Sequence, residues 1–429
     1  MIVPLFSGLE DIQGEDMKVN KEEVVKFFDG KDLDVQESGY GRWIDQKCTP
    51  DVVSAVADIV DSLINEEDAP EELTAQDVWY SKYARENILD QFNKSDPTDE
   101  RAVAEYNKFY QQPLNLLAYA GVLERGKKGR SNVYRVLNPE MLEYIGMSEK
   151  NALAFLQVYI TEVLQQSGLY QDFENFLTTQ DEDSFNELKS KFTDFCHEHT
   201  NIKKNYEPNR IFPKVLNPLA QQEHKLGAYR GRISKEPITY SSLMYNQKNF
   251  RDIFSQKPKN VSRQEWLVEH PVDQSLEAKF KADSARAKKY VRRFNDKYFD
   301  GKSELHDDYA KGNATQMHHI FPQHSYRELA GYLENIIALT PTQHFSEAHP
   351  NNNTNLVDPV VQELLLKSKA STIKYVTEHD DMDQIYSFDN FAHVLKVGFD
   401  LDEPEKDYDD YVSAINEINL HYDVIDKQK

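Results

Sequence analysis

Two adjacent histidines, His318 and His319, are the pair in this 429-residue chain whose types and spacing best suit catalysis. Neighbouring side chains on a β-strand project to opposite sides, so one imidazole can bind a cation while the other faces a water molecule. With a usual pKa of about 6.5, the second imidazole can be neutral and accept a proton near pH 7. Another histidine on a following helix, His344, can close the cation site from the other side. These groups suit hydrolysis of a phosphodiester, which needs an activated water and a cation that stabilises charge on the phosphate.

Two further residues complete this candidate site. We expect the side-chain carbonyl of Asn335 to accept a hydrogen bond from the ring N–H of His319, which would fix the tautomer and orientation of the base. His349 is a candidate third cation ligand. It is five residues after His344, so on an ideal helix the two side chains point about 140° apart around the axis. A residue four positions after His344 would lie only about 40° away, on the same face. Because a residue before a proline is biased out of the α conformation, Pro350 predicts that the helix ends near His349, whose side chain can then turn back. Water, or the asparagines that follow Pro350, are the alternatives to His349. These asparagines are Asn351, Asn352 and Asn353.

The residues stand in a pattern that resembles the HNH, or ββα-metal, nuclease motif, in which a hairpin and a helix surround one divalent cation. The matching boxes are His318-His319-Ile320-Phe321-Pro322, then Asn335, then Leu339-Thr340-Pro341 followed by His344. The resemblance implies that His318 and His344 bind the metal, that His319 is the general base and that Asn335 orients it. Some members carry zinc-binding cysteines where this chain has Thr340 and Gln343, so we expect packing to hold the element together here. The wider arrangement looks most like type II restriction endonucleases with an HNH module.

Upstream of the motif, a helix over 113–121 and a hairpin are predicted. Pro113 suits the first turn of that helix, and Gly121 suits its C-terminal cap. Two short strand-like runs, 122–125 and 133–137, flank a glycine-containing basic turn. A helix followed by a basic hairpin resembles a winged helix, whose wing commonly touches the DNA backbone. A winged fold used for packing or protein contacts is equally consistent with the pattern. The candidate DNA contacts in the turn are Lys127, Lys128 and Arg130.

A basic segment lies in an otherwise acidic chain. The net charge is −23, yet residues 201–263 contain eight lysines and five arginines against three glutamates and one aspartate, a local charge of +9. Such a segment is typical of a surface that binds phosphates. Arginine can pair with guanine and asparagine with adenine, so tyrosines interleaved with these residues favour DNA contact over a solvated loop. The candidate contacts are Arg230, Arg232, Lys235, Asn246, Lys248, Asn249 and Arg251.

Hydrophobic periodicity predicts a mainly helical α+β protein with several domains. The predicted division is 1–70 N-terminal helical segment, 71–148 winged-helix-like domain, 149–200 helical connector, 201–305 basic DNA-recognition region, 306–400 HNH catalytic module with a following helix, and 401–429 acidic C-terminal helix.

Several classes of protein are excluded or disfavoured by the sequence. The chain has no run of about 18 apolar residues, the length that a membrane-spanning helix needs. Its N-terminus lacks the basic region and cleavage site of a signal peptide. Two cysteines, Cys48 and Cys196, are too few for a disulfide framework or a four-cysteine zinc site. The expected location is therefore the cytoplasm of a prokaryote.

Together these features predict a divalent-metal-dependent double-stranded DNA endonuclease, most like a sequence-specific type II restriction enzyme. The resemblance implies products with 5′-phosphate and 3′-hydroxyl ends. We expect one divalent cation per subunit, Mg²⁺, with Mn²⁺, Ni²⁺ or Zn²⁺ as alternatives. The expected partners are a second copy of the chain, since a palindrome has two strands to cut, and a cognate DNA methyltransferase in the same host. The alternatives are a modification-dependent restriction nuclease and a DNA-binding regulator with an inactive HNH remnant.

Overall fold

The chain folds into two compact units that divide at Asp252. The computed structural model describes residues 21–66, 68–87, 91–92, 103–204, 206–245, 258, 261, 263–271, 274–344, 357–401 and 410–426. We call the described residues up to Tyr245 the N-terminal unit and those from Pro258 the C-terminal unit. Both units are mainly helical with small two-stranded sheets, which confirms the predicted α+β class. The region predicted over 201–305 is therefore shared between the two units.

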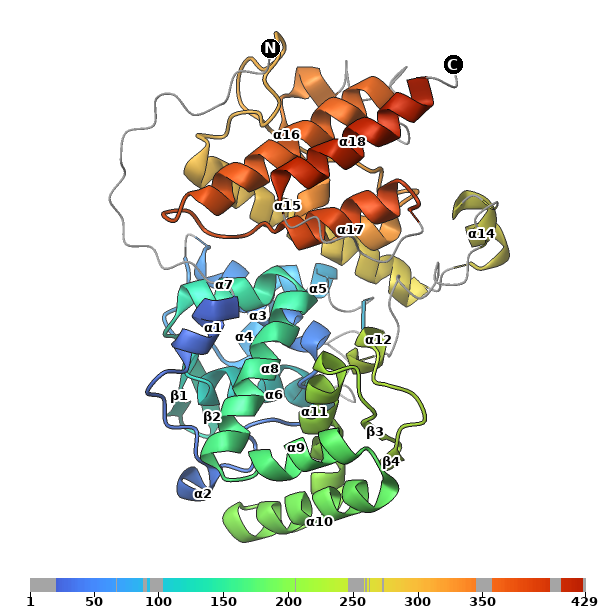
Figure 1. Cartoon of the computed structure of the whole chain (residues 1–429). Coiled ribbons are helices and arrows are strands. Elements are labelled where there is room, and N and C mark those ends of the chain that lie inside the picture. Colours follow the sequence, from blue (N-terminus) through green and yellow to red (C-terminus); the bar gives the residue numbers. More distant parts are fainter. Residues whose placement is uncertain are drawn as a thin grey trace. The chain divides into compact units, whose positions relative to one another are not determined.

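Helices make up most of the N-terminal unit (Figure 1). They are α1 (Lys21–Phe27), α2 (Val35–Ser38), α3 (Pro50–Ile64), α4 (Ala75–Tyr80), α5 (Lys82–Asn87), α6 (Val103–Tyr119), α7 (Pro139–Met147), α8 (Glu149–Gln166), α9 (Tyr170–Thr179), α10 (Glu182–His199), α11 (Tyr206–Gln222) and α12 (Tyr240–Leu243). The strands are β1 (Leu123–Lys128), β2 (Ser131–Val136), β3 (Ala228–Tyr229) and β4 (Arg232–Ile233).

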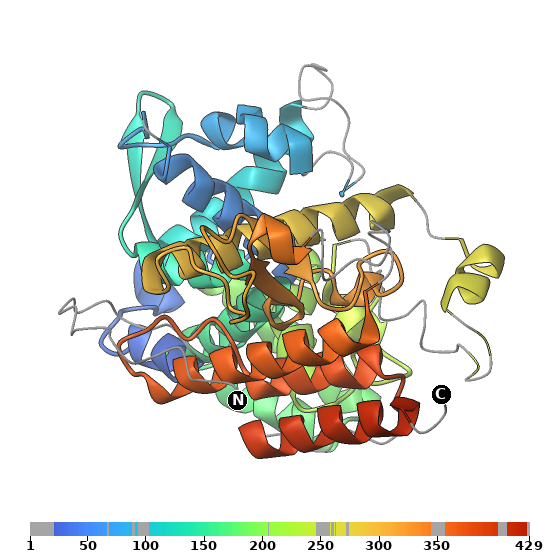
Figure 2. The same ribbon diagram turned by 90° about the horizontal axis from the view of Figure 1, so that it is seen from above.

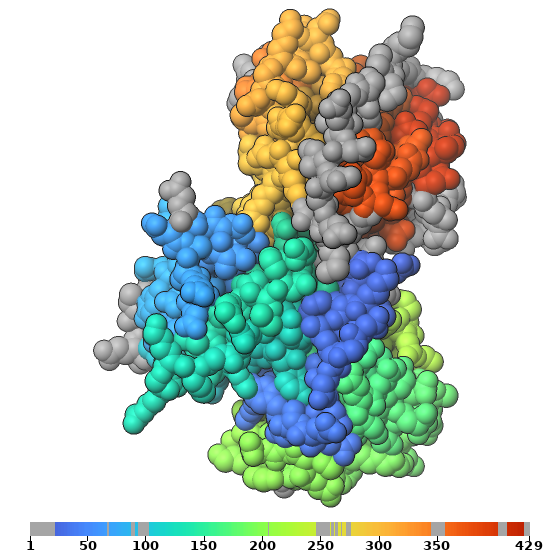
Figure 3. All heavy atoms as spheres, turned by 90° about the vertical axis from the view of Figure 1, so that its left-hand side faces the viewer, coloured from blue at the N-terminus to red at the C-terminus, as the bar shows by residue number. Residues whose placement is uncertain are grey.

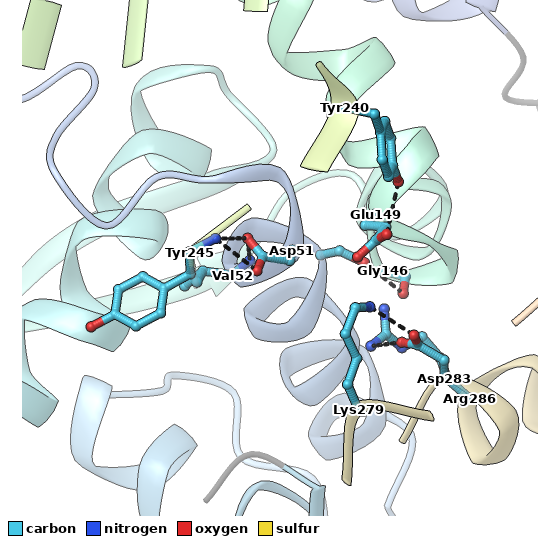
Figure 4. Close-up of polar contacts among 10 residues, drawn as sticks. Asp51, Val52, Gly146, Glu149, Tyr240, Tyr245, Lys279, Asp283 and Arg286 are labelled. Carbon is cyan, nitrogen blue, oxygen red and sulfur yellow. Dashed lines mark hydrogen bonds and ion pairs between the residues drawn. The ribbon is translucent and has the colours of Figure 1, made fainter. Parts of the chain in front are cut away.

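Helix α3 forms the centre of this unit and packs against α7 and α8. Pro50 occupies its first turn, where the missing N–H costs nothing. The apolar residues of this helix form part of the core, and several of its polar residues are buried as well. One of these, Asp51, accepts the backbone N–H of Tyr245 at 2.9 Å, which satisfies the buried carboxylate (Figure 4).

The predicted helix and hairpin are both present, with one difference in the helix. Helix α6 begins at Val103, so Pro113 lies inside it, and the prediction that Pro113 occupies the first turn is wrong. Residues on the preceding turns, including Tyr106 and Phe109, are buried, and this packing outweighs the loss of one backbone hydrogen bond at proline. Strand β1 pairs with β2 antiparallel, from Leu123 opposite Val136 to Lys128 opposite Ser131. The hairpin prediction is therefore confirmed.

The C-terminal unit contains four long or medium helices around one small sheet. Its elements are α14 (Arg263–Glu269), α15 (Gln274–Tyr298), α16 (Pro359–Glu378), α17 (Phe388–Gly398), α18 (Tyr411–Asp426), the strands β5 (Gln316–His319) and β6 (Ile336–Leu339), and two short 3₁₀ turns, Arg327–Leu329 and Leu333–Asn335. Helix α18 runs alongside α16 (Figures 1 and 2). Its Ala414, Ile418 and Tyr422 are buried, which confirms the predicted helix near the end of the chain.

Strands β5 and β6 form an antiparallel pair on which helix α15 packs. All four residues of β6 are buried, which explains its uninterrupted apolar sequence, Ile336 to Leu339. Among the described residues, no helix has both the length and the apolar character needed to cross a membrane.

Candidate catalytic site

The β5–β6 hairpin and the turn that follows it bring His318 and His344 together. His318 lies opposite Ile337 in the strand pair. Thr340 follows β6, and its carbonyl accepts the backbone N–H of His344 at 3.0 Å in one helical turn. This turn returns the chain to β5, so that the ring centres of His318 and His344 lie 5.1 Å apart with an interplanar angle of 78°. The two predicted metal ligands are therefore neighbours in the structure.

This spacing fits two imidazoles that share one cation. With metal–nitrogen distances of about 2.0–2.1 Å, two rings on one ion have centres roughly 4.5–5.5 Å apart. His318 Nε2 and His344 Nδ1 are both buried nitrogens. Within the described residues, no group of three or more His, Cys, Asp or Glu side chains is placed to hold a metal. His349, the predicted third ligand, lies outside these residues, so His318 and His344 are the predicted ligands that the structure brings together.

His319, the predicted general base, is buried beside the pair. Its Nε2 lies 3.2 Å from the carbonyl oxygen of Ala330. Because a carbonyl can only accept, Nε2 carries the hydrogen and Nδ1 carries the lone pair. Burial, together with the nearby positive charge of Lys288, lowers the pKa of His319 to about 3. The ring is therefore neutral near pH 7, and with so low a pKa it is a weaker proton acceptor than an ordinary imidazole.

Asn335 holds the loop around His319 and makes its hydrogen bonds with the backbone. Its Oδ1 accepts the N–H of Phe321 at 2.9 Å, and its Nδ2 donates to the carbonyls of Phe321 at 3.2 Å and Leu329 at 3.4 Å. The expected direct bond from the His319 ring to the Asn335 side chain is therefore wrong. The residue that orients the ring is Ala330, next to Leu329, so Asn335 positions the base through the loop that it closes.

A cavity of about 360 Å³ opens onto these histidines. Three elements line it: helix α15, strand β5 with the loop after it, and the turn at His344. The lining residues are Glu277, Phe280, Lys288, Met317, His318, His319, Pro322, Gln323, His324, Arg327 and His344. The cavity combines four imidazoles with two cations and one carboxylate, which is a setting suited to an anionic substrate.

The contributions from α15 and from the loop after β5 were missed by sequence reasoning. Glu277 and Lys288 lie on the same face of α15, and Arg327 donates to Glu277 at 2.7 Å. The eleven-residue spacing of Glu277 and Lys288 could have shown that they share one face of a helix. The sequence does not show that this face packs beside β5. His324 lies in a turn after β5 and also lines the cavity.

Hydrogen bonds support the hairpin at the two positions where some HNH proteins carry zinc ligands. The Gln343 Oε1 accepts from the hydroxyl of Ser303 at 2.6 Å and from the backbone N–H of Thr340 at 3.0 Å. Its Nε2 donates to the carbonyl of Leu305 at 2.7 Å and to Asp307 at 2.9 Å. Thr340 and Gln343 are fully buried or nearly so. The side-chain amide thus ties the turn before His344 to residues 303–307, where the expectation was packing alone.

The predicted DNA-contact residues that the structure describes lie on two exposed hairpins of the N-terminal unit. Lys127, Lys128 and Arg130 are at the end of β1–β2, which projects from the surface of this unit (Figure 3). Arg230 and Arg232 lie on β3–β4, and Lys235 follows it. The two hairpins lie on different sides of the unit (Figure 1), so they do not form one continuous basic surface. The remaining candidates, Asn246, Lys248, Asn249 and Arg251, lie outside the described residues.

Hairpin β3–β4 presents its arginines in a fixed geometry. Arg230 and Gly231 both have positive φ, 50° and 82°, as a two-residue type I′ turn requires. The Arg230 guanidinium lies 5.2 Å from the ring centre of the exposed Tyr229, and Lys189 donates to the carbonyl of Gly231 at 3.0 Å. An exposed turn held in this way can present arginine and tyrosine to a phosphate or a base edge.

Comparison with known proteins finds no match: no family model, no curated protein and no solved structure matches this chain. The site is therefore interpreted from its own residues and their geometry.

Replacing either His318 or His344 by alanine is expected to weaken metal binding by at least about 10²-fold, because even the loss of a group that only orients a ligand costs 10- to 100-fold. Titration calorimetry of the full chain with Ni²⁺ alone measures this. His379→Ala is the matched control, since that ring stacks on Tyr375 and does not line the cavity. If His318→Ala and His344→Ala bind Ni²⁺ as tightly as His379→Ala and the unchanged protein do, the two histidines are not metal ligands.

Changing Arg230 and Arg232 together to glutamine is expected to reduce the salt dependence of DNA binding. Each lost phosphate contact lowers the slope of log K against log salt concentration by about 0.9. The comparison is the triple change Lys127→Gln, Lys128→Gln and Arg130→Gln on the other hairpin. A lower slope only in this triple variant would place DNA at β1–β2 and show the prediction for β3–β4 to be wrong.

Proposed function

We propose that this chain is a metal-dependent endonuclease that hydrolyses phosphodiester bonds of double-stranded DNA, with an HNH-type catalytic centre. The observation that carries the proposal is the closeness of His318 and His344, whose ring centres lie 5.1 Å apart. His318 comes from strand β5, and His344 comes from the turn after its partner strand β6. The neutral His319 lies beside them in the same cavity. Hairpin, turn and histidines have the order and spacing of the ββα-metal motif that the sequence resembles.

In the proposed reaction, His319 accepts a proton from the attacking water through Nδ1. Its Nε2 remains bound to the carbonyl of Ala330, which fixes the direction of the ring and stabilises the imidazolium that forms. Asn335 maintains this arrangement by closing the loop on Phe321 and Leu329. A divalent cation held by His318 and His344 would supply charge stabilisation at the phosphate and the leaving oxygen.

The same proposal assigns DNA recognition to the N-terminal unit. Helix α6 with the β1–β2 hairpin has the order of a winged helix, and both basic hairpins of this unit are exposed. We propose that these surfaces select the DNA, as in a type II restriction enzyme, and that a homodimer cuts both strands. A DNA methyltransferase in the same host would protect its genome.

Incubation of the purified full chain with phage DNA tests the proposed activity. Separate reactions contain Mg²⁺, Mn²⁺, Ni²⁺, Zn²⁺ or EDTA, and the fragment ends are then sequenced. The expected result is cleavage with a divalent cation, no cleavage in EDTA, recurrent cut sites and 5′-phosphate ends. DNA binding without cleavage in any of these metals would overturn the proposal in favour of a DNA-binding protein with an inactive centre. Cleavage confined to methylated DNA would assign the modification-dependent class.

A further inference from the structure

Lys288 differs from Arg327, the other cation that lines the cavity, in having no carboxylate partner among the residues that the structure describes. On the same helix, Lys279 and Arg286 share the carboxylate of Asp283, at 2.7 and 3.2 Å (Figure 4). Across the cavity, Arg327 is paired with Glu277 at 2.7 Å. Within the described part of the chain, no carboxylate pairs with Lys288 or raises its pKa.

Lys288 is also partly removed from water. Its side chain lines the cavity, and burial lowers the pKa of its ammonium group. A cation in such a place has lost part of its hydration and has gained no counter-charge in return. An anion that enters the cavity would supply that counter-charge.

The position of Lys288 relates it to the base as well. Lys288 and His319 line the same cavity. An anion bound by Lys288 would therefore lie beside the group that activates the water. Lysine binds phosphate as a point charge, and a preorganised cation at a phosphoryl group stabilises the charge that grows there during hydrolysis.

We propose that Lys288, on helix α15 outside the histidine motif, binds the scissile phosphate of the substrate strand and stabilises its negative charge during cleavage. The inference rests on the proposed endonuclease activity and deepens it, because it places the substrate phosphate between α15 and the β5–β6 hairpin. It also gives helix α15 two roles, because the side that faces the cavity would bind substrate while the helix packs against β6.

Lys288→Gln is the test, and Lys289→Gln is its matched control. Lys289 is the next residue of α15 and carries the same charge, but its ammonium lies 4.5 Å from the ring centre of Tyr290 and it does not line the cavity. We expect Lys288→Gln to lower kcat on a cleavable duplex about 10²-fold, as the loss of one preorganised donor does elsewhere. Lys288→Arg should recover part of this loss, and Lys289→Gln should stay within about twofold of the unchanged protein.

A second readout does not depend on cleavage. DNA binding is measured in EDTA over a series of salt concentrations, where Lys288→Gln is expected to lower the slope of log K against log salt concentration by about 0.9, the effect of one phosphate contact. If the unchanged chain fails to cut DNA, the proposed function fails, while this slope still tests the role of Lys288. If the unchanged chain cuts and Lys288→Gln matches Lys289→Gln in both kcat and slope, the inference about Lys288 is overturned.

Discussion

His319→Ala is expected to lower kcat for DNA cleavage by about 10²–10⁴-fold, the usual contribution of a positioned general base. The physical reason is that the substitution removes the Nδ1 lone pair that accepts the proton of the attacking water. DNA binding and Ni²⁺ binding should remain, because His318 and His344 are unchanged. The measurements are single-turnover cleavage of a labelled duplex, DNA affinity in EDTA and titration with Ni²⁺.

The control for this variant is His379→Ala, which removes an imidazole that caps the C-terminal end of α16 and does not line the cavity. It should cleave at the rate of the unchanged protein. Cleavage by His319→Ala at that same rate would show that another group accepts the proton. A simultaneous loss of Ni²⁺ binding would instead indicate a damaged site, which the binding titration distinguishes from a loss of base catalysis.

The second large effect is expected in stability, at Lys369. Its ammonium is fully buried and donates to the two carboxylate oxygens of Glu304, at 3.0 and 3.3 Å. Glu304 also accepts the backbone N–H of Ala338 at 2.9 Å, so the ion pair supports the outer edge of β6. Lys369→Met leaves a buried carboxylate without its counter-charge, a change that costs about 3–5 kcal/mol.

Native-state hydrogen exchange at the amides of β6 measures this free energy directly. Lys374→Met is the control on the same helix, since Lys374 forms a largely exposed ion pair with Glu378 at 3.8 Å, and such pairs contribute about 0–1 kcal/mol. The double variant Lys369→Met with Glu304→Gln should lose less than Lys369→Met alone, because no buried charge remains unpaired. A loss at Lys369 no larger than at Lys374 would contradict this account.

The local elements of the site could be predicted because their signals are local. His318 and His319 stand at the end of a short strand, and the run Ile336 to Leu339 is apolar throughout, so a buried hairpin follows from the residue types. The Thr340-Pro341 sequence marks the start of a helical turn, which places His344 near β5. The adjacency of His318 and His344 therefore follows from the motif and its chain connectivity.

The parts that could not be predicted depend on packing between distant segments. Lys288 precedes the histidine motif in sequence, and its place in the cavity depends on which face of α15 packs against the β5–β6 pair.

Asn335 was expected to contact the base because an amide suits that role. Its full burial instead directs its oxygen and nitrogen to the backbone of the loop, whose polar groups also need partners. Which hydrogen-bond partner a buried side chain takes depends on the groups that the fold places around it, and the sequence alone does not show these groups.

The absence of thiols near the site has a consequence for how the protein responds to its surroundings. Both cysteines, Cys48 and Cys196, belong to the N-terminal unit and are buried, and Gln343 holds the turn before His344 by accepting from Ser303 and donating to Leu305. The fold of the C-terminal unit therefore does not depend on a zinc–thiolate site, and we expect chelators to leave it intact. We therefore expect the removal of divalent cations to leave this unit folded and to be reversible when the cations are restored.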